Sequence, residues 1–423
     1  MVAYKSYMRI LIVGINYAPE ITSTGKYTTE AAEWLAARGH EVRVICGPPY
    51  YPYWKVQKPY SAWAYSHETI AGVGVFRCPV WVPQRPTGFK RIIHLGSFAL
   101  SSIPTCIAQL FWKPDIVVAI EPPLFGAVVA LFGAKVICAK SWLHIQDFEL
   151  DAAMGLGMIP VWLASGIGVF ERWFMGKFDR VSTISNAMME RVRQKGVSSD
   201  KVSIFPNWVD CGALRPLEQG DSLRGEWGIP SDSKVILYAG NVGKKQGLEL
   251  LFSVAERFLV KRPDVLFVIV GEGAAKMDLE RAVLENGLTN IIFKPLQPIE
   301  KLGALLATAD VHLVLQLQGA ADLVMPSKLT GILAAGGAVL ATAEETTELY
   351  KVVTQNEVGQ VAQPGSSEGI EMGIESLLGD MTLLQRYRHN ARKFAEANLH
   401  KEAILWDFEQ ELNRVVVPYG GGD

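Results

Sequence analysis

The stretch that decides the fold is Lys234–Gly273, which reads KVILYAGNVGKKQGLELLFSVAERFLVKRPDVLFVIVGEG. It begins with a short apolar run, Val235–Ala239, and ends with another, Val265–Val270, followed by Gly271 and Gly273. Each run has the length of a buried strand. Between the runs, apolar residues recur with helical spacing: Leu248, Leu251, Phe252, Ala255 and Phe258. The order of strand, glycine-rich turn, helix and strand predicts a right-handed βαβ unit.

The turn after the first strand of this unit predicts a phosphate site. It contains Gly240, Gly243 and Gly247, with Lys244 and Lys245 just before the last glycine. The start of a helix offers unpaired N–H groups and the positive end of the helix dipole to an anion. The glycines follow neither the G-x-G-x-x-G nor the Walker spacing. An ordinary α/β crossover with a surface lysine pair therefore stays open as the alternative.

The composition describes a folded protein of two domains. The 423 residues are 49% apolar and 20% charged, and a chain of this length exceeds one hydrophobic core. The net charge of −2 gives no electrostatic reason to expect nucleic acid as a partner. No C-x-x-C pair, zinc-like histidine spacing or D-x-D motif occurs, so we expect reduced thiols, a cytoplasmic location and no metal site. The N-terminal residues lack the apolar core of a secretory signal.

The first half of the chain opens with a second predicted βαβ unit. Ile10–Gly14 and Val42–Cys46 are expected strands, and Lys26–Arg38 is an expected helix that ends at a glycine. The loop between the first strand and the helix, Ile15–Gly25, is longer than a simple connection requires. We therefore expect this loop to line a binding site.

The amino-acid composition of three aromatic or apolar stretches in the first half predicts their structural roles. Gly47–Ser66, which contains PPYYPYWK, has no periodicity and is predicted to form a surface loop or lid. Ile92–Trp112 approaches the length of a membrane span, but polar residues interrupt it, so we predict a buried or membrane-facing helix. Ile159–Phe178 combines aromatic and basic residues, as helices in a bilayer interface do, with internal packing as the alternative.

The remaining pattern alternates strands with helices in both halves. In the first half we expect strands at Asp115–Ala119, Lys135–Ala139, Phe178–Ser182 and Val202–Phe205, and a helix at Leu124–Gly133. In the second half we expect strands near residues 235, 265, 290, 310, 338 and 358, and helices at Ser366–Leu378, Met381–Asn398 and Lys401–Val416. A polar, proline- and glycine-containing segment, Leu214–Ser233, is interpreted as a linker. The predicted class is α/β, with domains at residues 1–215 and 216–398 and a C-terminal helix and tail at 399–423.

The order of short motifs along the chain narrows the choice of family. The motifs are N-Y-A-P-E (16–20), S-T-G-K-Y (23–27), H-I-Q-D-F (144–148), P-N-W-V-D (206–210), A-G-N-V-G-K-K-Q-G (239–247), V-G-E-G (270–273) and P-S-K-L-T-G-I-L-A-A-G-G-A-V-L-A-T (326–342). In this order they resemble family 4 of the retaining glycosyltransferases, over essentially the whole chain. The resemblance implies the GT-B fold, which consists of two facing Rossmann-like domains, with the C-terminal helix returning to the first. Among its members, the chain looks most like the colanic-acid subgroup of exopolysaccharide biosynthesis, for which fucosyl transfer is the expected reaction.

The resemblance also implies roles for residues of the first half. The second half would bind a sugar nucleotide and the first a glycosyl acceptor, with the chemistry in the cleft. Thr24 and Gly25 match the glycine loop whose amides face the donor diphosphate, and Gly25 also opens the first predicted helix. His144 matches the cleft histidine that contacts the donor sugar or its leaving phosphate. Asp147 follows it at the carboxyl end of a strand, where α/β proteins bind ligands, although a lone histidine is often structural.

The phosphate-binding cations depart from the family pattern. Family members have an arginine after the strand glycine and a lysine before the last glycine of the loop, where this chain has Asn241 and Gln246. We assign the phosphate contact to Lys245, with Lys244 as the alternative. A second candidate for phosphate binding is the helix that follows Pro326. Ser327 is its predicted N-cap, and Lys328 would place a cation near the phosphate. The predicted donor-binding residues are Thr24, Gly25, Gly240, Asn241, Gly243, Lys244, Lys245, Gly271, Gly273, Ser327 and Lys328.

The family's pair of glutamates is absent. At the position of the later glutamate, which contacts the donor ribose in the family, this chain has Gly331. At the position of the earlier glutamate it has Leu323, next to Asp322. We expect Asp322 to replace the earlier glutamate, with a solvated loop acid as the alternative, and Glu344 or Glu345 to contact the ribose. The predicted catalytic residues are His144, Asp147, Lys245 and Asp322.

The expected reaction follows from these assignments. A pair of carboxylates suited to double displacement is not evident, and helix N-termini with lysines can stabilise a leaving diphosphate as Mg²⁺ does elsewhere. The resemblance implies metal-independent, front-face retaining transfer from a GDP- or UDP-linked sugar, without a further cofactor. The expected acceptor is a lipid-linked oligosaccharide at the inner face of the cytoplasmic membrane, with peripheral membrane contact. A sugar-nucleotide epimerase or hydrolase of the same fold, and a degenerate non-catalytic binding subunit, stay open as alternatives.

Overall fold

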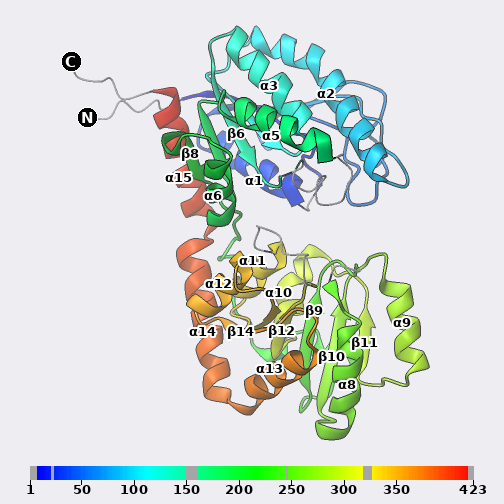
Figure 1. The fold of residues 1–423 in the computed structure, drawn as a ribbon. Coiled ribbons are helices and arrows are strands. Elements are labelled where there is room, and N and C mark those ends of the chain that lie inside the picture. The colour runs from blue at the N-terminus through cyan, green and yellow to red at the C-terminus, as the bar shows by residue number, and fades with distance from the viewer. Residues whose placement is uncertain are drawn as a thin grey trace, which may run out of the picture. The chain divides into compact units, whose positions relative to one another are not determined.

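The protein divides into two compact α/β units (Figure 1). The computed structural model describes residues 7–20, 23–148, 150, 161–243, 246–317 and 326–417. Unit 1 comprises Met1–Pro206 and Ala403–Asp423, and unit 2 comprises Asn207–Glu402. The predicted C-terminal helix is α15 (Lys401–Val416), and nearly all of it belongs to unit 1.

Unit 2 begins ahead of Pro216, the boundary expected from the sequence. The reason is that Val209, Cys211 and Leu214 are buried in a core cluster of unit 2. The backbone of Val209 is also paired there, since its N–H donates to the carbonyl of Leu399 at 2.8 Å. The core of unit 2 therefore includes residues that precede the expected boundary.

The sheet of unit 1 has eight strands in the order β3-β4-β2-β1-β5-β6-β7-β8, and all its pairings are parallel except that of β3 with β4. The strands are β1 (Arg9–Val13), β2 (Glu41–Cys46), β3 (Ser66–Ile70), β4 (Val73–Arg77), β5 (Ile116–Glu121), β6 (Lys140–Ile145), β7 (Arg180–Thr183) and β8 (Val202–Ile204). The helices are α1 (Ser23–Ala37), α2 (Gly88–Leu110), α3 (Leu124–Val136), α5 (Val161–Met175), α6 (Asn186–Gln194) and α15. The central strands β1 and β5 are almost entirely buried, as in parallel sheets with both faces covered.

Helix α15 is fixed to unit 1 by aromatic and ionic contacts. The Phe408 ring stacks on that of Phe205, with centroids 4.0 Å apart, and meets Trp142 edge-on. Next to it, the buried Glu409 carboxylate accepts a hydrogen bond from His40 Nε2 at 2.9 Å. These contacts connect residues at opposite ends of the chain, which sequence patterns alone do not pair.

Unit 2 has the strand order of a Rossmann fold. Its six parallel strands lie in the order β11-β10-β9-β12-β13-β14, so the order reverses between β9 and β12. The strands are β9 (Lys234–Ala239), β10 (Val265–Val270), β11 (Ile291–Lys294), β12 (Val311–Val314), β13 (Val339–Thr342) and β14 (Gly359–Ala362). The helices are α7 (Arg224–Trp227), α8 (Leu250–Lys261), α9 (Lys276–Glu285), α10 (Leu302–Ala307), α11 (Ser327–Ala334), α12 (Glu348–Gln355), α13 (Ser367–Gly379) and α14 (Met381–Asn398). Ligands of such sheets bind beyond the carboxyl ends of the strands at this reversal.

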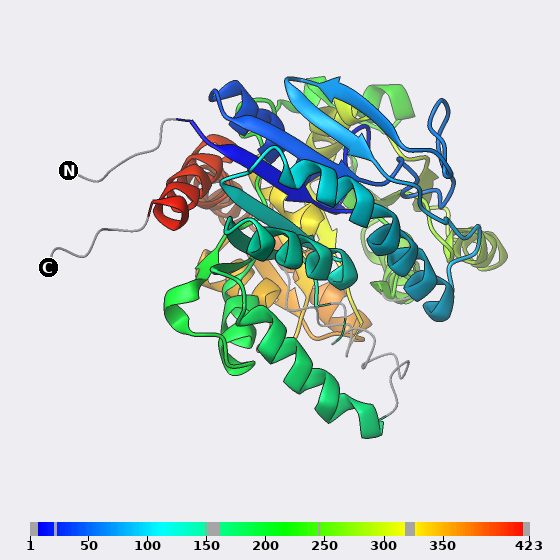
Figure 2. The same cartoon turned by 90° about the horizontal axis from the view of Figure 1, so that it is seen from above.

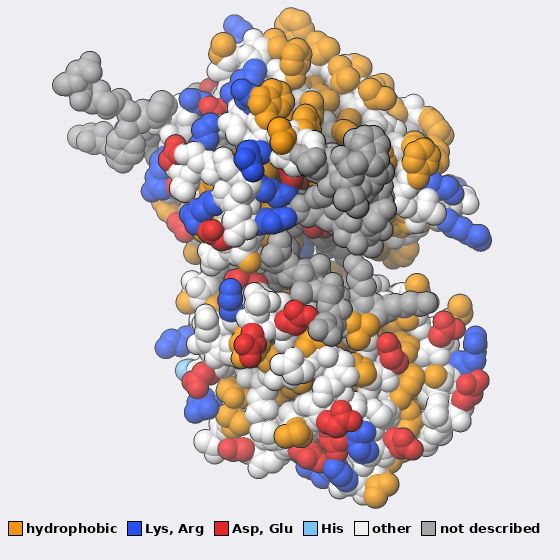
Figure 3. Space-filling view, viewed as in Figure 1, with side chains coloured by type: hydrophobic (Ala, Val, Ile, Leu, Met, Phe, Trp, Pro, Cys, Tyr) orange, Lys and Arg blue, Asp and Glu red, His pale blue; other side chains and the backbone are white. Residues whose placement is uncertain are grey.

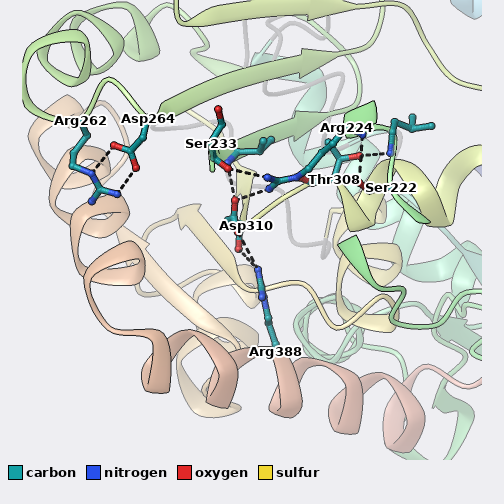
Figure 4. Close-up of polar contacts among 10 residues, drawn as sticks. Ser222, Arg224, Ser233, Arg262, Asp264, Thr308, Asp310 and Arg388 are labelled. Atoms are coloured by element: carbon teal, nitrogen blue, oxygen red, sulfur yellow. Dashed lines mark hydrogen bonds and ion pairs between the residues drawn. The ribbon is translucent and has the colours of Figure 1, made fainter. Parts of the chain in front are cut away.

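A buried ion network ties α7 and α14 to this sheet (Figure 4). The Arg224 guanidinium donates to Asp310 Oδ2 at 2.6 Å and to the carbonyl of Ser233 at 2.8 Å. The same carboxylate oxygen accepts from the N–H of Val235 at 2.8 Å. Arg388 on α14 donates to the carbonyl of Asp310 at 3.0 Å. Asp310 therefore neutralises a buried arginine at the amino end of β9 and β12, away from the glycine turns.

One expectation for unit 1 is wrong, and one hairpin of this unit was not predicted. The predicted strand Lys135–Ala139 does not form, because α3 continues to Val136 and β6 begins only at Lys140. The chain turns at Cys138, whose φ is 56°, and the N–H of Ala139 donates to the carbonyl of Ala134 at 2.9 Å. The β-branched residues of this segment resemble a strand, but packing extends the helix through them. The hairpin of β3 and β4 was not predicted, because β3 is an exposed edge strand without an apolar pattern.

Candidate functional site

In unit 2, two turns at the carboxyl ends of β9 and β10 interlock. Gly240 and Gly271 adopt φ angles of 147° and 153°. A Cβ atom on Gly271 would lie 1.8 Å from the carbonyl oxygen of Gly240, and one on Gly273 would lie 2.1 Å from that of Val242. The N–H of Val242 donates back to the carbonyl of Glu272 at 2.9 Å. Only glycine permits backbones to approach so closely, so these glycines shape the floor of the site.

The amides of these glycines are largely used within the protein. The N–H of Gly240 donates to a carbonyl of β10 at 2.9 Å, and that of Gly271 donates to a carbonyl of β11 at 3.4 Å. The N–H of Gly243 donates to Gln246 Oε1 at 3.1 Å. The expected helix also begins later, since α8 starts at Leu250. In the described part of these turns, the glycines therefore act mainly through their shape.

Lys328, the second residue of α11, supplies a buried cation beside these turns. Its Nζ lies 3.9 Å from the centroid of the Tyr238 ring and 3.5 Å from where a Cβ of Gly240 would be. Among the described residues, this buried ammonium has no hydrogen-bond partner. Burial lowers the pKa of Lys328 from 10.5 to about 7. Tyr238 is itself held in place, since its hydroxyl donates to the carbonyl of Asn241 at 2.7 Å.

The start of α11 differs from the prediction by one residue. Pro326 occupies the N-cap, and Ser327 is the first helical residue without a capping side-chain hydrogen bond. The carbonyl of Ser327 instead accepts from the hydroxyl of Thr330 at 2.8 Å. Because α11 begins at Ser327, Lys328 lies in the first turn of the helix, where unpaired backbone N–H groups favour an anion.

In unit 1, the loop after β1 is a compact polar turn that packs against the start of α1. Asn16 Nδ2 donates to Glu20 Oε2 at 2.7 Å, and the Thr24 hydroxyl lies 3.4 Å from Asn16 Oδ1. Gly25 is the third residue of α1, not its first as predicted. A Cβ on Gly25 would lie 3.2 Å from Cβ of Glu20, which leaves little room for a side chain. Thr24 and Gly25 are therefore placed side by side at a helix N-terminus near the carboxyl end of β1.

Glu20 organises this loop, although the sequence patterns did not single it out. Its buried Oε1 accepts hydrogen bonds from the N–H groups of Tyr50 and Tyr51 at 2.7 and 2.8 Å. Desolvation raises the pKa of Glu20, while these hydrogen bonds oppose that rise. Arg77 donates to the carbonyl of Ala18 in the same loop at 2.6 Å. The available signal was an acidic residue at the end of the motif N-Y-A-P-E, after the apolar strand Ile10–Gly14.

His144 ends β6 as a buried, neutral residue. Only 2% of it is exposed, and burial lowers its pKa to about 3. The Gln146 amide nitrogen donates to His144 Nε2 at 2.9 Å, so the ring proton lies on Nδ1, which donates to Ser182 Oγ at 2.9 Å. The same hydroxyl accepts from Trp142 Nε1 at 2.7 Å. The orientation of His144 is thus fixed from both sides, and it does not act as a charged group near neutral pH.

Asp147 lies at the surface just beyond β6. Gln146, which precedes it, is anchored by its N–H to the carbonyl of Glu121 at the end of β5, at 2.8 Å. The carboxyl ends of β1, β5 and β6 therefore bring Asn16, His144 and Asp147 to the same edge of the unit 1 sheet.

Comparisons with known proteins cover both units. Residues 23–208 match the family described as "Glycosyl transferase 4-like domain", and residues 220–394 match "Glycosyl transferases group 1". The chain is 44% identical over 412 residues to the Escherichia coli protein named "Putative colanic acid biosynthesis glycosyl transferase WcaI", covering 96% of this chain and 100% of that protein. The chain belongs to the family 4 glycosyltransferases. The resemblance inferred from the motif order is thereby confirmed.

Solved structures share the fold of this glycosyltransferase. Sucrose-phosphate synthase from Thermosynechococcus elongatus matches with a TM-score of 0.73 at 16% identity, covering 96% of this chain and 99% of that one. HepE from Anabaena, solved in complex with UDP-glucose, matches with a TM-score of 0.67 at 14% identity over the same shares. At such identities the likeness concerns the fold alone, which is GT-B as predicted.

Several predicted residues of the glycosyltransferase lie outside the described part of the chain. These are Lys244, Lys245 and Asp322, together with Leu323. Gly331, which takes the place of the family's ribose-binding glutamate, lies on α11, where a Cβ would contact Leu214 at 3.6 Å. Glu344 and Glu345 follow the carboxyl end of β13. Their predicted ribose contact stays a prediction.

The described residues of the glycosyltransferase contain no group of three or more histidine, cysteine, aspartate or glutamate side chains arranged to hold a metal ion. Lys328 places a cation beside Gly240, whereas the exposed Glu272 in the turn after β10 is paired with Lys276 at 2.7 Å. The Lys328 cation therefore suits this site to an anionic ligand, whose negative charge would balance that of the lysine.

Proposed function

We propose that this glycosyltransferase moves a sugar from a GDP- or UDP-linked donor to a lipid-linked oligosaccharide, with retention of the anomeric configuration and without a metal ion. The name of its relative from Escherichia coli refers to colanic acid, so an exopolysaccharide of that kind is the first candidate product. GDP-fucose is the first donor to test, followed by UDP-linked amino sugars. The proposal also places the protein in the cytoplasm, peripherally on the inner face of the cytoplasmic membrane.

The observation that carries the proposal is the buried Lys328 ammonium. A buried charge without a partner is costly, and its low pKa means that the site by itself disfavours the charged form. A diphosphate bound over the glycine turns would supply the missing counter-charge, and Lys328 would then regain its proton. The position at the reversal of strand order, between β9 and β12, supports a nucleotide as this ligand.

In the proposed reaction the cation acts on the leaving group. The bond between the anomeric carbon and the phosphate oxygen breaks, and charge accumulates on the departing diphosphate. Lys328, Lys245 and the start of α11 would stabilise that charge as fixed positive groups. The acceptor hydroxyl attacks the same face of the sugar, and its proton passes to the departing phosphate oxygen. No protein nucleophile is required, which suits the absence of an evident carboxylate pair in the sequence motifs.

The polar edge of unit 1 would hold the acceptor and the transferred sugar. His144 is neutral and fixed by Gln146 and Ser182, so its proposed role is to position a hydroxyl or phosphate oxygen through hydrogen bonds. Thr24 and Gly25 at the start of α1 are the proposed second contact with the diphosphate. Asp147 is the proposed acceptor-binding carboxylate.

A panel of nucleotides tests the proposal. Thermal unfolding of the purified protein is measured with GDP, UDP and dTDP, and with the corresponding monophosphates as controls. We expect one diphosphate to raise the melting temperature clearly more than its monophosphate, because binding to the folded state stabilises it. Failure of every diphosphate to do so would contradict the assigned site.

A transfer assay with the donor so identified tests the reaction. Product formation from a lipid-linked acceptor should survive EDTA, and NMR of the product should show the anomeric configuration of the donor sugar. Activity that requires an added divalent ion, or an inverted product, would refute the mechanism. Release of free sugar or of an epimerised nucleotide would instead indicate a hydrolase or epimerase, and binding without any turnover would indicate a non-catalytic subunit.

A further inference from the structure

Helix α2 has its polar and apolar sides reversed for a helix that faces water. Half of its six buried residues are polar, namely His94, Ser102 and Gln109. Each makes a hydrogen bond inside unit 1: His94 Nδ1 donates to the carbonyl of Trp81 at 2.7 Å, the Ser102 hydroxyl donates to the carbonyl of Ala99 at 2.8 Å, and Gln109 Oε1 accepts from Arg43 at 2.9 Å. The exposed face is instead a stripe of large apolar side chains: Phe89, Ile93, Leu100, Ile103 and Ile107. Leu100 is 71% exposed, so the outer face of α2 is suited to an environment other than water.

Helix α3 extends this apolar face. It contacts α2 closely, because Gly126 leaves room for Phe98, and a Cβ on Gly133 would lie only 3.0 Å from Cys106 Sγ. Figure 2 shows the two helices side by side on one face of the sheet of unit 1. The outer side of α3 carries a second exposed stripe: Phe125, Val128, Phe132 and Val136. Together the two stripes form one surface, here called the α2–α3 face, on which Figure 3 shows hydrophobic side chains gathered.

The segment of sequence that contains α2 carries only positive charge. From Cys78 to Pro114, which includes α2, the sequence contains four basic residues and no acidic one. Two of them, Lys90 and Arg91, are exposed in the first turn of α2, where the helix dipole disfavours a cation. The chain as a whole carries a net charge of −2, so this excess is local. An anionic partner surface would offset the unfavourable position of these cations.

Aromatic side chains border the same face. The hydroxyl of Tyr65 donates to the carbonyl of Ser101 on α2 at 2.9 Å, which places this exposed tyrosine beside Leu100. Trp63, two residues earlier, is also exposed. Tyrosine and tryptophan with an apolar body and a polar tip are typical of the level of lipid headgroups. The aromatic segment predicted as a lid thus borders α2.

By length and composition, α2 is the single helix among the described residues that could cross a membrane. Its contacts with β2, with α3 and with Arg43 hold it against the sheet, and 33% of its most apolar window is buried within the protein. These contacts would have to break for the helix to span a bilayer. The arrangement fits a helix that lies along the surface of a membrane.

We propose that the α2–α3 face docks unit 1 on an anionic lipid bilayer, with the apolar stripes in the headgroup–acyl boundary and the basic residues at the phosphates. The inference deepens the proposed function, on which it rests for the lipid-linked acceptor, by naming the surface that meets the membrane. The bilayer is favoured over a protein partner because apolar stripes, unbalanced basic charge and interfacial aromatic residues occur on one surface.

Vesicle flotation of the full chain tests this surface. The vesicles contain phosphatidylethanolamine with phosphatidylglycerol, or phosphatidylcholine alone. The test variant is Leu100→Glu with Phe132→Glu, and the matched control is Val260→Glu with Leu284→Glu on unit 2, where the replaced residues are 86% and 81% exposed. We expect wild type and control to float with anionic vesicles, and the test variant to bind at least about tenfold more weakly, because interfacial binding scales with buried apolar area. Lys90→Glu should weaken binding by about tenfold and remove much of its salt dependence.

Different outcomes separate this inference from the proposed function. Circular dichroism and the nucleotide-induced thermal shift should be unchanged in the test variant, because the substituted side chains are exposed on outer helices. Equal flotation of test variant and control, or no flotation of wild type, would overturn the α2–α3 face as a membrane surface. Loss of flotation in Trp173→Glu on α5, without loss in the test variant, would assign docking to α5 instead. A dimer of wild type that the test variant abolishes, without vesicle binding, would show that a second copy covers this face.

Discussion

Replacing Lys328 with methionine should raise the stability of the nucleotide-free protein and weaken its binding of the nucleotide. The substitution keeps the length of the side chain beside Tyr238 and removes the buried charge. A fall of the lysine pKa from 10.5 to about 7 corresponds, at about 1.4 kcal/mol per tenfold change in proton affinity, to roughly 4 kcal/mol at pH 7. For a domain of about 200 residues, such a gain would raise the melting temperature by about 8–16 °C.

The pH dependence gives the sign of this effect. Between about pH 7 and pH 10.5 the unfolded chain holds a proton on Lys328 that the folded, nucleotide-free protein has lost. The stability of wild type should therefore rise with pH across this window, relative to Lys328→Met. The advantage of the variant is thus largest near pH 7 and below, and it shrinks toward pH 10.5.

The assay combines urea denaturation with calorimetric titration of the diphosphate found in the nucleotide panel. We expect Lys328→Met to bind it about 10- to 100-fold more weakly, because a charged hydrogen bond contributes about 1.5–3 kcal/mol. Lys351→Met, at an exposed site on α12, is the matched control and should change neither quantity. A less stable Lys328→Met protein, or one with unchanged affinity, would refute the assignment of this lysine.

Three other substitutions test contacts of the two units. Asp310→Ala should lower the free energy of unfolding by about 3–5 kcal/mol in urea titrations, since it removes the carboxylate that neutralises the buried Arg224, whereas a loss below about 1 kcal/mol would show that the network is unimportant. Gly271→Ala should abolish the nucleotide-induced thermal shift, because its Cβ would collide with the opposite turn; an unchanged shift would contradict the interlocked geometry. His144→Ala should lower kcat. In the wild type, the profile of kcat against pH should show no titration of His144 between pH 5 and 8, because the pKa of His144 is about 3. A titration near pH 6.5 in this profile that disappears in His144→Ala would contradict the neutral, positioning role. Ser182→Ala should reproduce part of the loss of kcat.

The class of fold and most of its elements can be predicted from local sequence patterns. The strands of unit 2 lie where the apolar runs predicted them, because strands of a parallel sheet are buried on both faces and read as unbroken apolar runs. The helices Met381–Asn398 and Lys401–Val416 also have the predicted bounds, since their apolar residues recur with helical spacing. The order of the motifs along the chain identified the family.

Two elements of unit 1 could not be predicted from such patterns. The hairpin of β3 and β4 includes an exposed strand, so its residues carry no apolar period. The segment Lys135–Ala139 has strand-like residues, yet the contact of α3 with α2 extends the helix into it. In both places a local pattern competes with packing against distant residues, and packing decides.

Which charged and polar residues meet is a property of the folded chain alone. Lys328 was one of several candidate cations in the sequence, and its burial beside Tyr238 and Gly240 distinguishes it. The reversed faces of α2 likewise appear only when the buried side is known, because periodicity places residues on faces without saying which face meets the core. The physical reason is common to both cases. Short-range patterns encode the backbone hydrogen bonding and the period of each element, whereas desolvation and ion pairing depend on neighbours that lie far away along the chain.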